Sequence, residues 1–543
     1  MERPWRILVV ALAWGAGPAI CAAQVGQEPS LAGQQTHLGK VDFRTSCSEQ
    51  VRPTLEPEVQ PLLEKGLALL HSFQYREAQQ AFAEAASEEP HCAMAHWGKA
   101  MSLYQQLWDL PDKKKLREGY KEIEQARKLH PATVKEQGLL TAAAAYFQKN
   151  SKIRYTDRTK AYSLELARLD HEMPDDVEIG SFYALSLVSL AEQDVDSLAN
   201  QKKAISILEP LLEKYPDHPG VAHYLIHAAD RPELAPEGLE AARRYALIAP
   251  DSPHALHMPS HIFVRLGLWQ DSINSNIAAA ASAARLAEAH QAESHYQTHA
   301  MDFLNYSYLQ SGQEAKAREV IQHTDHVAGA DQETKIDHRA YLEARTAMEL
   351  HRWKDAAAIA DPPLSNEKLD NTRWARAIGA ARSGDVAAAE AAVQALKESV
   401  TEREDRERKE GYTVSTEKAS DLGEAEAWLA YAKGKIDEAL EELRAAAVHQ
   451  EKNGGESTAI PAREMLADLL LELKRPTEAL EEYRTVLKNA PNRFDGLLGA
   501  ARAAQASGER SEAQSFYAKL TEVCPPGADR PELAEAKTFV ARK

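Results

Sequence analysis

Four histidines of this 543-residue chain make two pairs of the same spacing, His223 with His227 and His257 with His261. Residues four apart on a helix share one face, so each pair can aim two imidazoles at one point. Neutral imidazole is the commonest protein ligand for zinc, copper and nickel. The two pairs therefore predict a metal site, with Zn, Cu or Ni as the candidate ions.

The offset between the two pairs along the sequence is 34 residues, and it indicates which helices carry them. This offset equals the repeat length of the tetratricopeptide (TPR) unit, a helix-turn-helix hairpin. Units counted from 219, 253 and 298 place further polar side chains at the positions that line a TPR groove. The candidate metal ligands on these three consecutive first helices are His223, His227, His254, His257, His261, His299 and Asp302.

Pro259 lies between His257 and His261 and bears on this geometry. Proline has no N–H to donate to the carbonyl of Ala255, so a continuous helix would lose one hydrogen bond there. If a helix instead starts at Met258, with Pro259 in its first turn, His257 leaves the helix face. Both geometries stay open at this point.

Two arginines with the same offset predict a different ligand. Arg231 and Arg265 are also 34 residues apart, and paired guanidinium groups can fork onto a carboxylate or a phosphate. Asp230 and Tyr306 fall on the same predicted surface, although Asp230 could instead neutralise Arg231. These four residues predict a groove that binds a peptide or protein partner, for example through a peptide's C-terminus, or an anionic small molecule.

Signatures of known enzyme mechanisms are scarce in the sequence. His223 and His257 each begin a spacing like that of zinc proteases, but neither is followed by the glutamate that acts as general base there. The chain also lacks a phosphate-binding glycine-rich loop, a nucleophile elbow and a dinucleotide fingerprint. Enzymatic use of the predicted metal site stays an open alternative.

The first residues predict export. Two arginines precede an apolar run, and small residues end at Ala23, so we expect a signal peptide at 1–23 and a periplasmic or secreted protein. A lipoprotein anchor on Cys21 is disfavoured because Ile20 stands where a small residue is expected. No later stretch approaches the roughly 20 apolar residues of a membrane span, so we expect no stable membrane anchor.

Composition and repeats together predict an all-α protein, a right-handed superhelical solenoid of TPR hairpins. The net charge of -18 argues against nucleic acid and anionic membranes as partners. After the signal peptide we expect an N-terminal extension at 24–55, TPR and TPR-like repeats at 56–397 with the histidine-rich groove at 219–310, a charged linker at 398–420, and C-terminal TPR repeats at 421–543.

Three cysteines remain after the predicted cleavage, Cys47, Cys92 and Cys524. An oxidising compartment permits a disulfide, and Cys47 with Cys92 is the favoured pair because Cys524 lies far along the chain. The alternative is that Cys92 is a small buried residue at the start of a helix. Both interpretations stay open.

Three motifs resemble those of a group of exported bacterial TPR proteins. They are Cys92-Ala-Met-Ala-His96-Trp97-Gly98, His223-Tyr-Leu-Ile-His227-Ala and His257-Met-Pro-Ser-His261-Ile-Phe-Val-Arg265. The resemblance covers roughly 40–355 and implies an all-α solenoid with a histidine-bearing groove, but no particular activity. His71 also fits the pattern, and we expect it in the groove but remote from the main cluster.

Two classes of function follow from these patterns. The first is an exported scaffold that binds a peptide or protein partner in its concave groove, as TPR repeats usually do. The alternative is a metal-binding protein or metalloenzyme that uses histidines of three adjacent repeats.

Overall fold

The computed structural model of the chain describes residues 37–48, 59–107, 110–149, 152–193, 197–289, 294–363, 367–410 and 418–542. Within those ranges every regular element is a helix. They belong to one structural unit that starts at His37. The predicted signal peptide at 1–23 lies outside the described residues, as does most of the predicted extension.

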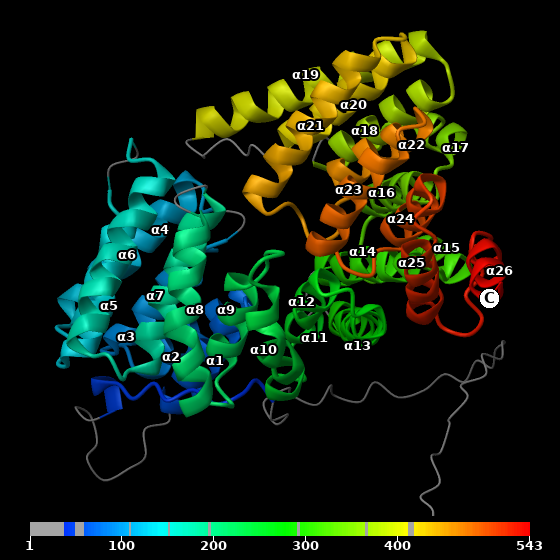
Figure 1. Cartoon of the computed structure of the whole chain (residues 1–543). Coiled ribbons are helices and arrows are strands. Elements are labelled where there is room, and N and C mark those ends of the chain that lie inside the picture. The colour runs from blue at the N-terminus through cyan, green and yellow to red at the C-terminus, as the bar shows by residue number, and fades with distance from the viewer. Residues whose placement is uncertain are drawn as a thin grey trace, which may run out of the picture. The chain divides into compact units, whose positions relative to one another are not determined.

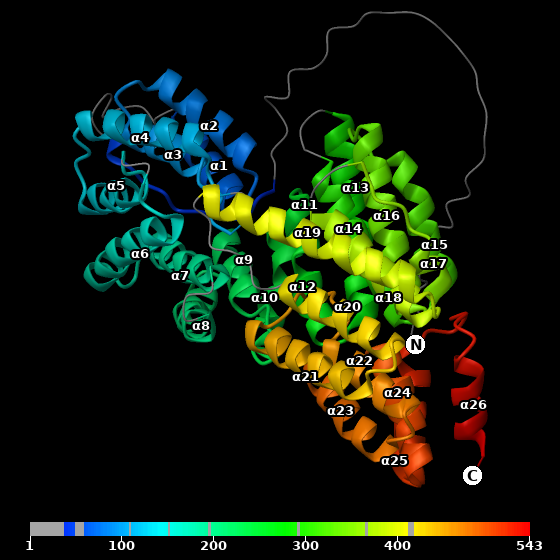
Figure 2. The same cartoon turned by 90° about the horizontal axis from the view of Figure 1, so that it is seen from above.

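The helices follow one another as hairpins, and successive hairpins pack together (Figures 1 and 2). The short 3₁₀ helices η2 (Ser46–Ser48) and η3 (Thr324–His326) and the last helix α26 (Leu533–Ala541) accompany them. The hairpins are α1 (Val59–His71) with α2 (Tyr75–Glu88), α3 (Ala93–Met101) with α4 (Lys113–Lys128), α5 (Val134–Tyr146) with α6 (Tyr155–Glu172), α7 (Val177–Glu192) with α8 (Ser197–Lys214), α9 (Pro219–Ala228) with α10 (Ala235–Ile248), α11 (Pro253–His257) and α12 (Pro259–Arg265) with α13 (Trp269–Glu288), α14 (His295–Gln310) with α15 (Glu314–His323), α16 (Gln332–Glu349) with α17 (Trp353–Ala357), α18 (Glu367–Arg382) with α19 (Val386–Glu410), α20 (Lys418–Ala432) with α21 (Ile436–Asn453), α22 (Ala462–Glu472) with α23 (Pro476–Asn489), and α24 (Phe494–Ser507) with α25 (Arg510–Val523).

Aromatic rings fill spaces between helices that glycines keep open. The ring of Phe82 in α2 is fully buried, and a side chain at Gly66 in α1 or Gly98 in α3 would collide with it. A Cβ atom at Gly98 would lie only 2.3 Å from the ring. Tyr483 and Gly499 repeat the arrangement near the C-terminus. Burial of one such ring stabilises the fold by about 1.5–3 kcal/mol, so these contacts hold neighbouring helices together.

Prolines and capping side chains set the start of two histidine-bearing helices. Pro219 and Pro253 lie in the first turn of α9 and α11, where the N–H group that proline lacks would have no partner in the helix. His218 caps α9 by accepting a hydrogen bond from the N–H of Val221, and Ser252 caps α11 in the same way. The two starts are 34 residues apart, so they keep the histidine pairs in the same register.

The chain divides into two helices at Pro259. α11 ends at His257 and α12 begins at Pro259, with Met258 between them. Pro259 thus lies in the first turn of a new helix, as in the second geometry considered above, but the predicted separation of His257 from His261 is wrong. His257 nevertheless stays beside His261, with their Nε2 atoms 3.0 Å apart. The break leaves the histidine pair together.

A disulfide bond joins Cys47 to Cys92, which confirms the predicted pair. Cys92 is also fully buried at the N-cap of α3, so the second interpretation of this residue holds as well. The bond ties the segment before α1 to the second hairpin. Cys524 is the free cysteine of the described residues, and burial raises its pKa to about 12.

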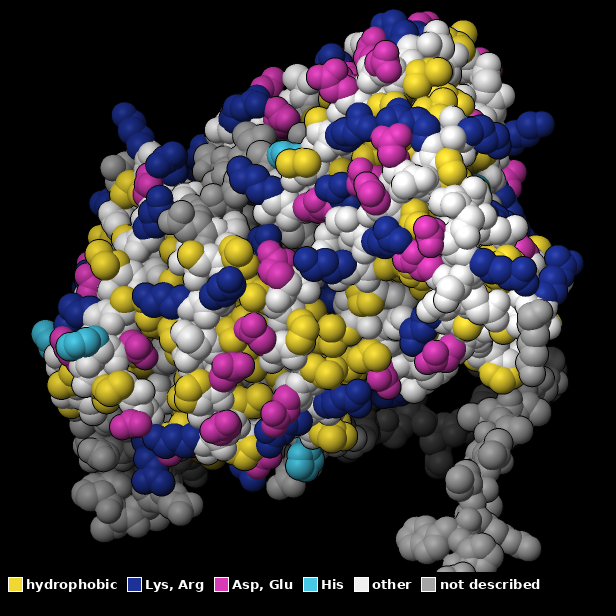
Figure 3. All heavy atoms as spheres, viewed as in Figure 1, with side chains coloured by type: hydrophobic (Ala, Val, Ile, Leu, Met, Phe, Trp, Pro, Cys, Tyr) yellow, Lys and Arg dark blue, Asp and Glu magenta, His cyan; other side chains and the backbone are white. Residues whose placement is uncertain are grey.

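Acidic and basic side chains are interspersed over the face of the molecule seen in Figure 3. The charged stretch predicted as a linker is helical as far as Glu410, the end of α19, and 411–417 lie outside the described residues. Among the described helices, none combines the length and the apolar character that a bilayer crossing needs.

Candidate metal centre

Six histidines from three successive hairpins gather into two groups of three. They come from α9, from α11 and α12, and from α14, which are the first helices of their hairpins. Within each group the three potential ligand atoms all lie within 4.8 Å of one another. We call His223, His227 and His254 triad 1, and His257, His261 and His299 triad 2.

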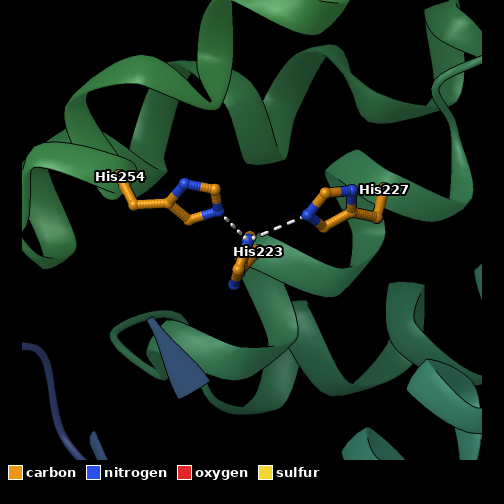
Figure 4. Close-up of side chains that lie close together, drawn as sticks. All are labelled: His223, His227 and His254. Carbon is orange, nitrogen blue, oxygen red and sulfur yellow. Dashed lines mark hydrogen bonds between the residues drawn. The ribbon is translucent and has the colours of Figure 1, made fainter. Parts of the chain in front are cut away.

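The three rings of triad 1 point toward one another (Figure 4). The Nε2 atom of His223 lies 3.0 Å from Nε2 of His254 and 3.1 Å from Nε2 of His227. All three side chains are buried. Two nitrogen ligands at 2.0–2.1 Å from one tetrahedral zinc ion would lie about 3.3 Å apart, so the observed spacing is close to that of a ligand set.

The tautomer of His223 is fixed by the main chain. Its Nδ1 atom lies 2.6 Å from the carbonyl oxygen of His71, and a carbonyl can only accept a hydrogen bond. Nδ1 therefore carries the proton, and Nε2 of the neutral ring carries a lone pair. That single lone pair cannot accept linear hydrogen bonds from both His227 and His254. A cation at the centre would satisfy all three nitrogens.

Triad 2 shows the same arrangement with different supporting groups. Nδ1 of His257 lies 2.7 Å from Oδ1 of Asn276, and Nδ1 of His261 lies 2.8 Å from a carboxylate oxygen of Asp230. Both partners accept a hydrogen bond, so both Nε2 atoms carry lone pairs in the neutral rings. These two Nε2 atoms are 3.0 Å apart. Two lone pairs at that distance repel each other unless a cation, a metal ion or a proton, lies between them.

The environment keeps the imidazoles neutral. Burial, reinforced by the neighbouring histidines, holds the pKa of each of the residues His223, His227, His254 and His257 well below its usual value. A metal ligand must be the neutral form of the ring. These four histidines are thus in the ligating form at neutral pH.

One phenylalanine packs against the rings of each triad. The ring centroid of Phe73 lies 4.4 Å from that of His223 and 5.5–5.6 Å from those of His227 and His254. Phe303 lies 4.5–5.3 Å from the three rings of triad 2. Such an apolar neighbour limits water access to one side of a metal site.

A third cluster, His71 with Glu178 and His218, is satisfied by hydrogen bonds alone. Both histidines contact the Glu178 carboxylate through Nε2, at 2.7 and 3.1 Å. Their Nδ1 atoms pair with the hydroxyl of Tyr224 and the N–H of Val221. Burial alone would raise the pKa of Glu178, but His218 and His71 hold it below its usual value. We assign this cluster to the packing of α1, α7 and α9.

Comparison with known proteins supports the repeat assignment. The tetratricopeptide repeat family profile matches residues 63–106 and 424–494. The chain contains tetratricopeptide repeats. The predicted fold class, an all-α solenoid of TPR hairpins, is thereby confirmed.

Solved structures of IFIT1 align with most of the chain at low sequence identity. The human IFIT1 dimer with PPP-AAAA is 12% identical, with a TM-score of 0.34 over 86% of this chain and 91% of that one. A monomeric mutant of IFIT1 with Gppp-AAAA is 15% identical, with a TM-score of 0.35 over 86% of this chain and 100% of the other. No curated protein sequence matches the chain.

Asp302 belongs to neither triad. Its Oδ1 atom is 3.3 Å from Nδ1 of His338, which belongs to α16 of the next hairpin. Lys368 also contacts that nitrogen, at 3.0 Å. The structure therefore groups six of the seven predicted metal ligands and places Asp302 in a neighbouring polar contact.

The predicted ligand-binding arginines contact the protein's own main chain. Arg231 donates to the carbonyl of Lys452 at 3.0 Å, and Arg265 donates to those of Gly454 and Gly455 at 3.1 and 2.7 Å. Arg265 also donates to Asp230 at 2.8 Å. Arg265 and His261 hold the pKa of Asp230 well below its usual range, although burial alone would raise it.

Tyr306 belongs to another network. Its hydroxyl lies 3.1 Å from Nη1 of Arg493, whose guanidinium is buried between the carboxylates of Glu349 and Glu464. The four residues proposed for peptide recognition thus separate into an arginine pair with Asp230, and a distant tyrosine.

Two residues that hydrogen-bond to triad histidines could not be predicted from the repeat spacing. Asn276 lies on α13, the second helix of its hairpin, and nothing in its spacing relates it to the histidines. His71 was expected to be remote from the cluster, but its carbonyl oxygen lies beside His223. The one signal for this residue in the sequence was that His71 fits the pattern of the similar exported TPR proteins.

Proposed function

We propose that this chain is a metal-binding TPR protein that holds a first-row transition ion in triad 1. The observation that carries the proposal is the convergence of three buried Nε2 atoms on one point, with the His223 tautomer fixed by a backbone carbonyl. An all-imidazole set suits zinc, copper or nickel, whereas magnesium and calcium require oxygen ligands.

Three protein ligands leave one position of a tetrahedral ion open. That coordination is typical of catalytic zinc sites, because structural sites close all four positions with protein ligands. The TPR helices supply the rigidity that a site of this kind needs, since the ligands project from helices rather than loops. The open position supports either exchange of the ion or binding of a small ligand to it.

Calorimetric titration of the metal-free chain with Zn²⁺ tests the proposal. We expect His223→Ala to weaken binding at triad 1 by more than about 100-fold, because the loss of a supporting group alone costs 10–100-fold. His171→Ala, which removes an exposed histidine of α6, is the matched control and should bind as the wild type does. Equal binding by His223→Ala and the wild type would contradict the proposal.

A second candidate, a scaffold that binds a peptide or protein partner, is favoured by the arginine contacts. Arg231 and Arg265, one repeat apart, already hold main-chain carbonyls at 452, 454 and 455. The same donors could bind the main chain of a partner that displaces this segment. Capture of a partner by the wild type, and its loss in Arg231→Ala/Arg265→Ala, would support this candidate.

We further propose that the protein works in the periplasm or outside the cell. The Cys47–Cys92 disulfide supports this location, since disulfides persist in oxidising compartments. The apolar run and the small residues that end at Ala23 support it independently. Detection of the mature chain that starts at Gln24 in a periplasmic fraction or in the medium would test it.

A further inference from the structure

The two triads lie directly beside each other. The ring centroids of His227 and His261 are 6.3 Å apart, and those of His254 and His257 are 6.4 Å apart. Both of these pairs have one member in each triad. Any ion held in triad 1 would therefore be close to any ion held in triad 2.

One short helix connects the two triads rigidly. α11 carries His254 of triad 1 and His257 of triad 2, three residues apart, so that both lie on one face of the helix. α12 then adds His261, and α14 adds His299 with its ring 4.5 Å from that of His257. The distance between the triads is thus set by a single turn of helix.

Triad 2 is the part of the centre that solvent reaches. His299 is exposed, whereas the other five histidines are buried. A small ligand can therefore approach from the side of His299. Phe73 and Phe303 pack against the rings of triad 1 and triad 2 respectively.

Charge balance indicates what such a ligand would be. Two divalent ions on six neutral imidazoles carry four positive charges. Asp230 hydrogen-bonds to His261 of triad 2, but Arg265 already pairs with this carboxylate. Uncompensated charge in a largely buried site is costly, so a pair of ions in this site requires a further anion.

On the basis of the proposed function, we propose that the two triads form a dinuclear centre. Each triad binds one divalent transition ion through three histidines, and a small anion such as hydroxide bridges the two ions. The open position that three ligands leave on each ion receives the bridge. The competing arrangement is a proton shared between His257 and His261, which would leave triad 2 without an ion.

Titration with Cu²⁺, followed by EPR and by total copper content, tests this inference. An isolated Cu²⁺ ion gives an EPR signal, whereas two Cu²⁺ ions joined by one bridging hydroxide couple magnetically and lose it. We expect the chain, purified without a histidine tag, to bind two copper ions. Its EPR signal should account for only a small fraction of the bound copper.

Variants of each triad complete the test. His254→Ala in triad 1 and His299→Ala in triad 2 should each bind one copper ion and give the full signal of an isolated ion. His299 is exposed, so its replacement should disturb the packing less than that of a buried histidine, and circular dichroism verifies the fold of both variants.

The outcomes separate the inference from the function on which it rests. One copper ion in the wild type, lost in His254→Ala and kept in His299→Ala, would overturn the dinuclear centre while the proposed function stands. Two ions that both give the signal of isolated Cu²⁺ would overturn the bridge. No bound copper in the wild type would overturn the inference together with copper binding at triad 1.

Discussion

At the scale of single residues, the hydrogen-bond partner of each imidazole decides which nitrogen faces the centre. A carbonyl, an amide oxygen and a carboxylate fix Nδ1–H in His223, His257 and His261. Their Nε2 lone pairs are thereby aimed inward before any ion arrives, which lowers the free energy needed to organise the site.

Asn276 offers a residue-scale prediction. Asn276→Ala removes the acceptor from His257, so the ring can adopt the other tautomer, and we expect the affinity of triad 2 for Zn²⁺ to fall about 10–100-fold. Asn276→Asp keeps an acceptor oxygen at the same place and should restore most of the affinity. Competition with a chromogenic chelator measures both. Equal affinity of Asn276→Ala and the wild type would show that the tautomer is not set by this contact.

At the scale of elements, the packing of α9 against α1 positions the backbone carbonyl that hydrogen-bonds to triad 1. Gly220 in the first turn of α9 lies against the ring of His71, and a Cβ atom there would be 2.3 Å from Nδ1 of that ring. The close approach positions α9 on the end of α1, where the carbonyl of His71 meets His223. A residue with a side chain would push the two helices apart.

Gly220→Ala is therefore expected to destabilise the protein by about 1–3 kcal/mol through overpacking, although alanine is ordinarily the better helix former. Urea unfolding measures the change. The matched control is Gly423→Ala in α20, where a Cβ atom would meet only the Cβ of Ala446 at 3.7 Å, and it should be neutral or slightly stabilising. A gain in stability from Gly220→Ala would show that this helix contact is not tight.

At the scale of the whole molecule, a chain of repeats is held mainly by contacts between neighbours, and the disulfide adds a longer link. Cys47 and Cys92 are 45 residues apart, so closing their loop stabilises the folded chain by about 4 kcal/mol in the chain-entropy model. We expect reduction to lower the urea midpoint of the N-terminal hairpins. Cys524→Ser, which leaves the bond intact, should show the same loss on reduction. An unchanged midpoint would mean that the N-terminal segment is held by packing alone.

The features of the fold and of the metal centre that recur every 34 residues could be predicted from the sequence. The 34-residue offset placed His223 with His227 and His257 with His261 on the first helices of two successive hairpins, as observed. The grouping into triads was not predictable, because it depends on contacts between helices: His254 of α11 lies beside His223 of α9, whereas His257 of the same helix lies beside His261 of α12.

Contacts between helices that are not equivalent in neighbouring repeats were also not predicted. Asp302 matches a groove position, but His338 of α16 lies against it. The arginine pair was correctly placed one repeat apart, yet its observed contacts are carbonyls some 200 residues further along the chain. Periodicity within the sequence carries no information about such distant neighbours.

X-ray absorption at the edge of the bound metal tests the central claim most directly. For the chain loaded with one equivalent of Zn²⁺, we expect a first shell of nitrogen at about 2.0–2.1 Å, with the multiple scattering of at least three imidazoles. The imidazole count should fall in the double variant His223→Ala/His257→Ala, which removes one ligand from each triad. A first shell of sulfur, or of oxygen with no imidazole scattering, would contradict the assignment of these histidines as the metal ligands.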